Sequence, residues 1–183
     1  MHTFLFADLV GFTALSLEQG DEQAANVATR FQRDVRALAA RHGATVVKSL
    51  GDGAMVRAED AGDALRLGLE LVNGLDGLPP VRVGLNTGPA VERDGDFFGS
   101  TVNLAARLSQ AARGGEVLLS DATRAAARRR GPRLEQRGAR TFRNARDPVV
   151  VYAASERPPL PKRLLEAKRR FVCPHMAART KAA

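Results

Sequence analysis

Apolar residues recur with helical spacing in several stretches of the chain. In residues 21–42 they follow the i, i+3, i+4 rule of an amphipathic helix, and Gly43 stands where a glycine commonly ends a helix. A second helix is expected to begin after the capping residue Asp60 and to stop at Pro79-Pro80. The same criteria predict two further helices, over residues 100–111 and 121–129, the latter capped by Asp121.

Short apolar or alternating runs between these helices predict β-strands. They cover residues 3–7, 44–50, 54–58, 81–86, 116–119, 134–136, 139–143 and 148–154. Gly51-Asp52-Gly53 is expected to form the tight turn of a hairpin, and Gly11-Phe12-Thr13 to turn the chain after the first strand. Because strands and helices alternate while hairpins are frequent, we expect an α+β fold with helices packed on a mixed sheet.

Length and charge indicate one domain followed by a basic tail. The chain has 183 residues, 44% of them hydrophobic, as is typical of one globular domain. Residues 1–123 carry a net charge of −5 and residues 124–183 a net charge of +13. The composition changes to Pro, Lys and Arg at Pro158, so we predict a domain over residues 1–155 and a tail over residues 156–183.

The basic last third allows two interpretations. It could bind a polyanion such as nucleic acid or anionic lipid, or it could form a solvated basic face. The second is favoured for Arg128-Arg129-Arg130, because no aromatic side chains interleave that run. Nucleic acid is therefore not the expected partner.

Several classes of protein are excluded by what the chain lacks. Its longest apolar run, residues 149–154, is far shorter than the ~20 residues of a membrane-spanning helix. Asp8 interrupts the N-terminal apolar run before a signal peptide could form, so we expect a cytoplasmic protein. Because Met1 stands directly before the first predicted strand, we also expect no N-terminal sensor or membrane anchor. The single Cys173 excludes a disulfide framework. Cys173 and His175 are soft metal ligands, but the intervening proline makes a metal site there the less favoured interpretation.

Two aspartates and a pair of helical residues are the candidates for chemistry. Asp8 and Asp52 each follow a predicted strand beside glycine. On neighbouring strands, two such carboxylates could hold Mg²⁺, and the glycine turn after Asp8 could present N–H groups to phosphate oxygens. The alternative is that both are turn aspartates that satisfy local amides. Asn103 and Arg107 lie four residues apart on one helix face, and arginine is well suited to bind phosphate.

Four segments of the chain occur together, in order, in a known family: FADLVGFT, KSLGDG, VRVGLNTG and DFFGSTVNLAAR. Over residues 1–155 the chain resembles the catalytic domain of class III nucleotidyl cyclases, the adenylate/guanylate cyclase family. The resemblance implies a ferredoxin-like sandwich with a mixed, mostly antiparallel sheet and helices packed on it. One departure is Asn86, where the family commonly has histidine at a position that is not catalytic.

The resemblance also implies a role for each site residue. The ligands of two divalent ions, Mg²⁺ or Mn²⁺, are matched by Asp8, Asp52 and the backbone carbonyl of Leu9. The residues that specify the purine are matched by Lys48 and Asp96. Those that bind the phosphates are matched by Phe12, Thr13, Arg82 and, more loosely, Arg143. Asn103 is implied to position the ribose, and Arg107 to stabilise the transition state.

The implied activity is an adenylate cyclase of intracellular signalling. Such an enzyme converts ATP to 3′,5′-cyclic AMP and pyrophosphate by attack of the ribose 3′-hydroxyl on the α-phosphate. A lysine donates to adenine N1 and an aspartate accepts from its 6-amino group, so Lys48 and Asp96 favour ATP over GTP. The family further implies a head-to-tail homodimer in which both chains contribute to each site.

The alternative is a catalytically silent module with the cyclase fold. Such a module would bind nucleotide or, through the basic last third, a polyanion. Silent relatives typically lose a metal-binding aspartate or the transition-state arginine. Asp8, Asp52, Asn103 and Arg107 are all present in this chain, which favours the enzyme.

Overall fold

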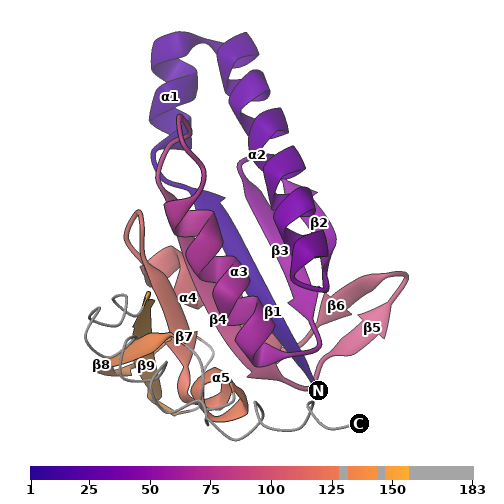
Figure 1. Ribbon diagram of the computed structural model, residues 1–183, viewed down its shortest axis with the longest axis vertical. Helices are drawn as coiled ribbons and strands as arrows, with labels where there is room; N and C mark the ends of the chain where they lie inside the picture. Colours follow the sequence, from indigo (N-terminus) through magenta and orange to yellow (C-terminus); the bar gives the residue numbers. More distant parts are fainter. Residues whose placement is uncertain (128–131, 144–146, 157–183) are drawn as a thin grey trace, which may run out of the picture.

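A seven-stranded sheet with helices on both faces organises the protein (Figure 1). The computed structural model describes residues 1–127, 132–143 and 147–156. Its elements are β1 (His2–Leu9), α1 (Phe12–Gln19), α2 (Asp21–Arg41), β2 (Ala44–Leu50), β3 (Gly53–Ala58), α3 (Ala61–Asn73), β4 (Val81–Gly88), β5 (Val91–Arg93), β6 (Asp96–Phe98), α4 (Ser100–Ala111), β7 (Val117–Ser120), α5 (Asp121–Ala126), β8 (Arg133–Arg140) and β9 (Val149–Ser155).

The strand order is β2-β3-β1-β4-β7-β9-β8, and the β5–β6 hairpin forms a separate small sheet. Within the described part of the chain, β4 and β7 pair in parallel and the other neighbours in the large sheet pair antiparallel. This arrangement confirms the predicted α+β fold with a mixed, mostly antiparallel sheet.

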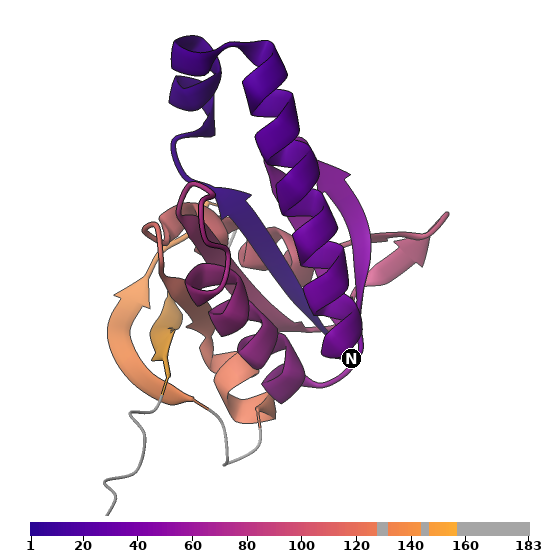
Figure 2. The ribbon, with the colours of Figure 1, turned by 45° about the horizontal axis from the view of Figure 1, so that its top comes forward.

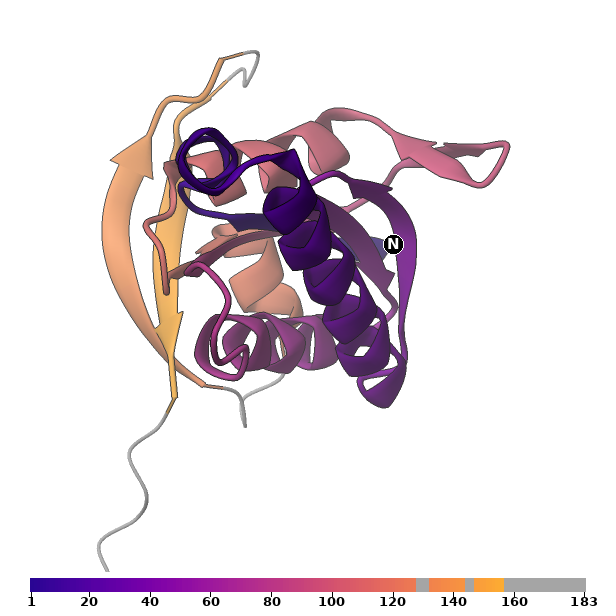
Figure 3. The ribbon, with the colours of Figure 1, turned by 90° about the horizontal axis from the view of Figure 1, so that it is seen from above.

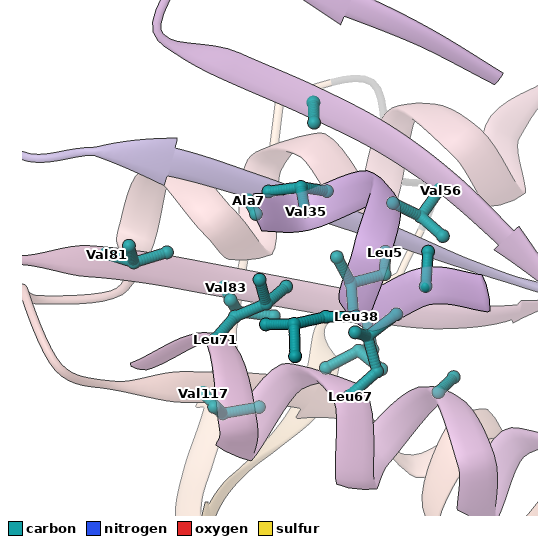
Figure 4. Packing of buried hydrophobic residues seen from close by; sticks show 14 of the residues in the cluster. Leu5, Ala7, Val35, Leu38, Val56, Leu67, Leu71, Val81, Val83 and Val117 are labelled. Atoms are coloured by element: carbon teal, nitrogen blue, oxygen red, sulfur yellow. The ribbon is translucent and has the colours of Figure 1, made fainter. Parts of the chain in front are cut away.

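The period-two pattern of β1 places its side chains on two different faces of the sheet. Leu5 and its alternate neighbours Ala7 and Leu9 join the main core beneath α2 and α3, which Figure 4 shows in close view. Phe4 faces the other way, into a second core with Val102 of α4. In Figures 2 and 3, α2 and α3 cover one face of the sheet and α4 lies on the opposite face.

The two helix boundaries that the sequence specifies most clearly are confirmed. The Asp60 carboxylate accepts hydrogen bonds from the Gly62 and Asp63 amides at the start of α3, as expected of a capping residue. Gly43 follows the end of α2 with a φ of 61°, the left-handed conformation that glycine adopts at little cost.

Other sequence predictions are wrong in detail. Phe12 and Thr13 open helix α1 instead of forming a plain turn. The segment between β4 and α4, in which no strand was predicted, contains the β5–β6 hairpin. The two strands expected over 134–136 and 139–143 are one strand, β8, with a bulge between Gln136 and Gly138. Ser120, not Asp121, caps α5, because its hydroxyl accepts from the Thr123 amide; the helix ends at Ala126.

Three features predicted from the sequence lie outside the described residues: the Arg128-Arg129-Arg130 run, the basic tail from residue 157, and the pair Cys173 and His175. In the part of the chain that is described, no helix is long and apolar enough to cross a membrane.

Candidate active site

Two aspartates meet where β1 ends beside the β2–β3 turn. Asp8 lies opposite Gly53 in the β1–β3 register, and the Leu9 amide donates a 3.0 Å hydrogen bond to the Asp52 carbonyl. A Cβ atom on Gly53 would come within 3.3 Å of Asp8 Oδ1. Glycine at this position therefore leaves room for the Asp8 carboxylate.

The electrostatics of this end of the sheet favour a bound cation. Burial, reinforced by the negative charge of Asp8, raises the pKa of the Asp52 carboxyl above its ordinary value, and nearby Arg82 partly opposes the shift. Arg82 Nε donates to Asp8 Oδ2 over 2.8 Å, and Arg82 Nη1 also reaches the Gln110 carbonyl at the end of α4, 3.4 Å away. The arginine predicted to bind phosphate is thus an ion-pair partner of Asp8.

The donor set suits Mg²⁺ or Mn²⁺. Within the described residues, no group of three or more His, Cys, Asp and Glu side chains lies together. Two carboxylates and the Leu9 carbonyl would leave the remaining ligands to water and substrate phosphates, which is the pattern Mg²⁺ commonly adopts in nucleotide sites. Such an ion would relieve the repulsion between the partly buried carboxylates of Asp8 and Asp52.

Lys48 and Asp96, predicted to specify the purine, are in contact. Lys48 Nζ donates to Asp96 Oδ2 over 2.5 Å, joining β2 to the start of β6. The Phe97 amide donates to the other carboxylate oxygen over 2.8 Å. The hydrogen bond from Lys48 is the main reason why the pKa of Asp96 lies below its ordinary value. The Phe97 ring anchors the hairpin by packing 5.3 Å from the ring of Phe4.

Helix α4 carries the predicted ribose and transition-state residues along an open pocket of about 300 Å³. Its lining includes Asn103, Arg107 and Arg143, together with Asn86 and Phe142. The structure therefore brings the loosely matched Arg143 into the same pocket as the α4 side chains. None of Asp8, Asp52, Lys48 and Asp96 lines this pocket.

The start of α1 presents a third feature that suits phosphate. Gly11, with a φ of 79°, precedes the helix, and no side chain caps its first turn. The first amides of a helix lack intrahelical acceptors and lie at the positive end of its dipole. The backbone N–H groups at Phe12 and Thr13 are therefore suited to bind phosphate oxygens.

The alternation of side chains along the strands places Asp8, Arg82 and Lys48 on the sheet face that carries α4. Asp8 alternates with the core residues Ala7 and Leu9, and Arg82 lies opposite it in the β1–β4 register. Lys48 lies opposite Met55, whose side chain belongs to the second core. Side chains paired across antiparallel strands share a face. Asp8, Arg82 and Lys48 therefore all lie on the sheet face opposite α2 and α3.

Sequence reasoning did not single out the contributions of Asn86, Phe142 and Gly53. For Asn86 a signal was present: in VRVGLN the apolar residues alternate with Arg82, Gly84 and Asn86, which places these three on one face. Phe142 reaches the pocket from the segment after β8, and no local pattern marks it.

The sequence model of the "Adenylate and Guanylate cyclase catalytic domain" family matches residues 2–155. The chain belongs to this family. An adenylate cyclase of Streptomyces coelicolor is 40% identical over 120 residues, 64% of this chain and 32% of that protein. A "pH-sensitive adenylate cyclase" of Mycobacterium tuberculosis is 39% identical over 127 residues, 68% of this chain and 32% of that protein. The chain thus spans about a third of the length of these curated relatives.

Solved cyclase structures share the fold. The adenylyl cyclase CyaB of P. aeruginosa superposes with a TM-score of 0.76 at 24% identity, covering 86% of this chain and 95% of that one. An adenylate/guanylate cyclase/hydrolase of Silicibacter pomeroyi gives a TM-score of 0.72 at 27% identity, covering 86% and 97%. These similarities establish that this nucleotidyl cyclase domain has the fold of its family.

Proposed function

We propose that the protein is an adenylate cyclase that converts ATP to 3′,5′-cyclic AMP and pyrophosphate. The observation that carries this proposal is the grouping of the required side chains: Asp8 lies beside Asp52 at the sheet end, and Asn103 and Arg107 line one pocket. The adenylate cyclases among the relatives support the same activity.

Asp8, Asp52 and the Leu9 carbonyl would hold two divalent ions. When bound, such ions lower the pKa of the attacking hydroxyl and neutralise charge on the triphosphate. The Asp8 and Asp52 carboxylates are suited to this task because their mutual repulsion favours cation binding. Arg82, paired with Asp8 in the free protein, would turn to the terminal phosphates when nucleotide enters.

The reaction forms one P–O bond and breaks another. The ribose 3′-oxygen attacks the α-phosphorus, the bond from that phosphorus to the bridging oxygen breaks, and pyrophosphate leaves while the hydroxyl proton passes to solvent. The Asn103 amide would hold the ribose, and the Arg107 guanidinium would donate to the α-phosphate as negative charge develops there. The α1 amides and Arg143 would bind the outer phosphates.

Base recognition would rest on Lys48 and Asp96. The lysine has three N–H donors, so it can keep its hydrogen bond to Asp96 and still donate to adenine N1. The Asp96 carboxylate accepts from the 6-amino group. Guanine offers a donor at N1 and an acceptor at O6, the opposite pattern, so neither group would find a matching partner on the base.

The complete site would form between two chains arranged head to tail. The α4 pocket is not lined by Asp8 or Asp52 of the same chain, which supports a site completed by a partner chain. In a C₂ homodimer, Asp8 and Asp52 of one protomer would face the base, ribose and transition-state residues of its partner. Two equivalent sites would result.

Product analysis tests the proposal. Purified protein is incubated with ATP and Mg²⁺ or Mn²⁺, and cyclic AMP and pyrophosphate are quantified. Equal amounts of the two products are expected, and Arg107→Ala should remove them. Nucleotide binding without either product would instead identify a silent nucleotide-binding module.

A further inference from the structure

Asn86 lies beneath the α4 pocket and has both ends of its amide occupied. Its side chain, on β4, is 5% exposed and lines the pocket. Asn86 Nδ2 donates to the Thr101 carbonyl in the first turn of α4 over 3.0 Å. Asn86 Oδ1 accepts from the Ser120 hydroxyl over 2.6 Å. One side chain therefore connects β4, α4 and the end of β7.

The start of α4 depends on such contacts because it has no cap of its own. Gly99 occupies the capping position with a φ of 138°, and no side chain there accepts a hydrogen bond from the helix. The first turn is held instead through Thr101, whose hydroxyl donates to the Pro89 carbonyl over 2.6 Å and whose carbonyl accepts from Asn86. Both contacts connect the first turn of α4 to the C-terminal end of β4.

The hydroxyl of Ser120, which donates to Asn86 Oδ1, is itself fixed. Ser120 also accepts from the Thr123 amide as the cap of α5, and it contacts the Thr123 hydroxyl at 3.3 Å. Thr123 in turn accepts from Thr87, which pairs with Thr3 of β1 over 2.9 Å. These hydroxyls are buried, so the network has little freedom to rearrange.

We propose that Asn86 is a positioning residue that fixes α4, and with it Asn103 and Arg107, relative to β4 and β7 of the large sheet. Asn103 and Arg107 follow Thr101 by two and six residues on the same helix, so a shift of the first turn displaces both. The role in turnover rests on the proposed cyclase activity, whereas the structural coupling does not. A displacement of about 1 Å at a reacting group can cost on the order of 100-fold in rate.

Three variants separate positioning from general stability. Asn86→Leu removes both hydrogen bonds and keeps the number and branching of the side-chain heavy atoms. Asn86→His restores one donor and one acceptor, since a neutral imidazole has one of each. Thr3→Val is the matched control, because it removes a buried hydroxyl of the same network that does not contact α4. Losing one buried hydrogen bond is expected to lower the Tm of Thr3→Val by roughly 2–4 °C, and losing two should lower that of Asn86→Leu by about twice as much.

Two readouts are compared well below the melting temperatures: steady-state kinetics with ATP, and hydrogen exchange of the amides of residues 100–107. Asn86→Leu should lower kcat by about 10- to 100-fold with KM changed less than about threefold, because the groups proposed to bind the outer phosphates, the α1 amides and Arg143, do not lie on α4. It should also speed exchange in the first turn of α4. Thr3→Val should change neither, and Asn86→His should recover most of kcat.

The proposal is overturned if Asn86→Leu matches Thr3→Val in kcat and in exchange, or if its effect is confined to KM, which would make Asn86 a substrate-binding residue. If Asn86→Leu does not fold, Asn86→Ala replaces it, because it also removes both hydrogen bonds and adds no bulk. If wild-type protein makes no cyclic AMP, the proposed function fails, and the exchange comparison alone decides whether Asn86 fixes α4.

Discussion

The Lys48 ammonium group lies 2.5 Å from Asp96 Oδ2, so the two side chains proposed to read the base hold each other before any nucleotide arrives. The contact joins an edge strand of the large sheet to a hairpin outside it. The contact favours the charged form of the Asp96 carboxyl and keeps both side chains in a fixed place. A preformed donor and acceptor of this kind discriminates against a base with the opposite pattern.

Replacing Lys48 should change both the titration of Asp96 and the choice of nucleotide. Because the hydrogen bond from Lys48 lowers the pKa of Asp96, Lys48→Met should raise that pKa toward its ordinary value, measured by NMR titration of the carboxyl carbon. The preference for ATP over GTP in kcat/KM should fall by about tenfold or more.

Glu92→Gln is the control for this experiment, since Glu92 is an exposed residue on the same hairpin, opposite Phe97. It should leave the Asp96 pKa and the nucleotide preference unchanged. Wild-type protein that uses ATP and GTP equally well would contradict the assigned role of the pair.

Neutralising Asp52 should remove activity without unfolding the protein. Burial and the charge of Asp8 both disfavour the Asp52 carboxylate, so Asp52→Asn relieves repulsion and is not expected to lower the Tm. Loss of a metal ligand should reduce cyclic AMP formation by about 100-fold or more, and Mn²⁺ binding, followed by electron paramagnetic resonance, should weaken in parallel. Asp76→Asn, at an exposed carboxylate after α3, is the control. Unchanged Mn²⁺ affinity in Asp52→Asn would refute the metal assignment.

The close approach of β4 and α4 should make Gly84 intolerant of any side chain. A Cβ atom there would lie 2.0 Å from the Ser109 amide nitrogen and 2.5 Å from the Ala105 carbonyl oxygen, both backbone atoms. Gly84→Ala should therefore lower the free energy of unfolding by about 3 kcal/mol or more, measured by urea denaturation.

Gly68→Ala on α3 provides the comparison, because its added methyl would meet only side-chain atoms, the nearest being 3.2 Å away on Val83. The gain of alanine over glycine within a helix, about 1 kcal/mol, should roughly offset that crowding. Equal stability of the Gly84→Ala and wild-type proteins would show that α4 packs less closely than described.

The sequence predicted elements with strong periodicity and missed those without it. The amphipathic pattern of α2 and the Asp60 cap of α3 are local signals, and both were confirmed. Helix α1 has no buried residue, so its sequence has no apolar stripe from which a helix could be predicted. The β5–β6 hairpin consists of two three-residue strands whose short length leaves little alternation to detect.

In the candidate site, too, local signals could be found from the sequence and contacts between distant residues could not. Asp8, Asp52, Asn103 and Arg107 could be selected by residue type and position next to glycine or along a helix. Their partners could not, because the contact of Arg82 with Asp8 joins residues 74 positions apart and depends on strand register. The catalytic roles of the selected residues stay predictions, which kinetic measurements on their variants test.

A chain that ends at Glu156 should fold and retain cyclase activity. Strand β9 ends at Ser155, opposite Arg133 of β8, so every strand that the structure describes lies before the predicted tail. Its Tm should lie within about 2 °C of that of the full chain, since exposed termini contribute little to stability. Insolubility of the shortened chain would show that residues beyond 156 pack on the domain.

Shared catalytic sites are the central claim, and mixing two inactive variants tests them directly. Asp8→Ala and Arg107→Ala homodimers should each be inactive. In a mixed dimer, one site collects both defects. The other takes its carboxylates from the Arg107→Ala chain and its arginine from the Asp8→Ala chain, so it is intact.

The measurement is cyclic AMP formation after subunit exchange between equal amounts of the two variants, with exchange verified by native mass spectrometry. Half of the dimers are then mixed and each has one intact site, so about a quarter of wild-type activity should return. If each site lay within one chain, every site would keep a defect. Continued inactivity after complete exchange would contradict the shared site.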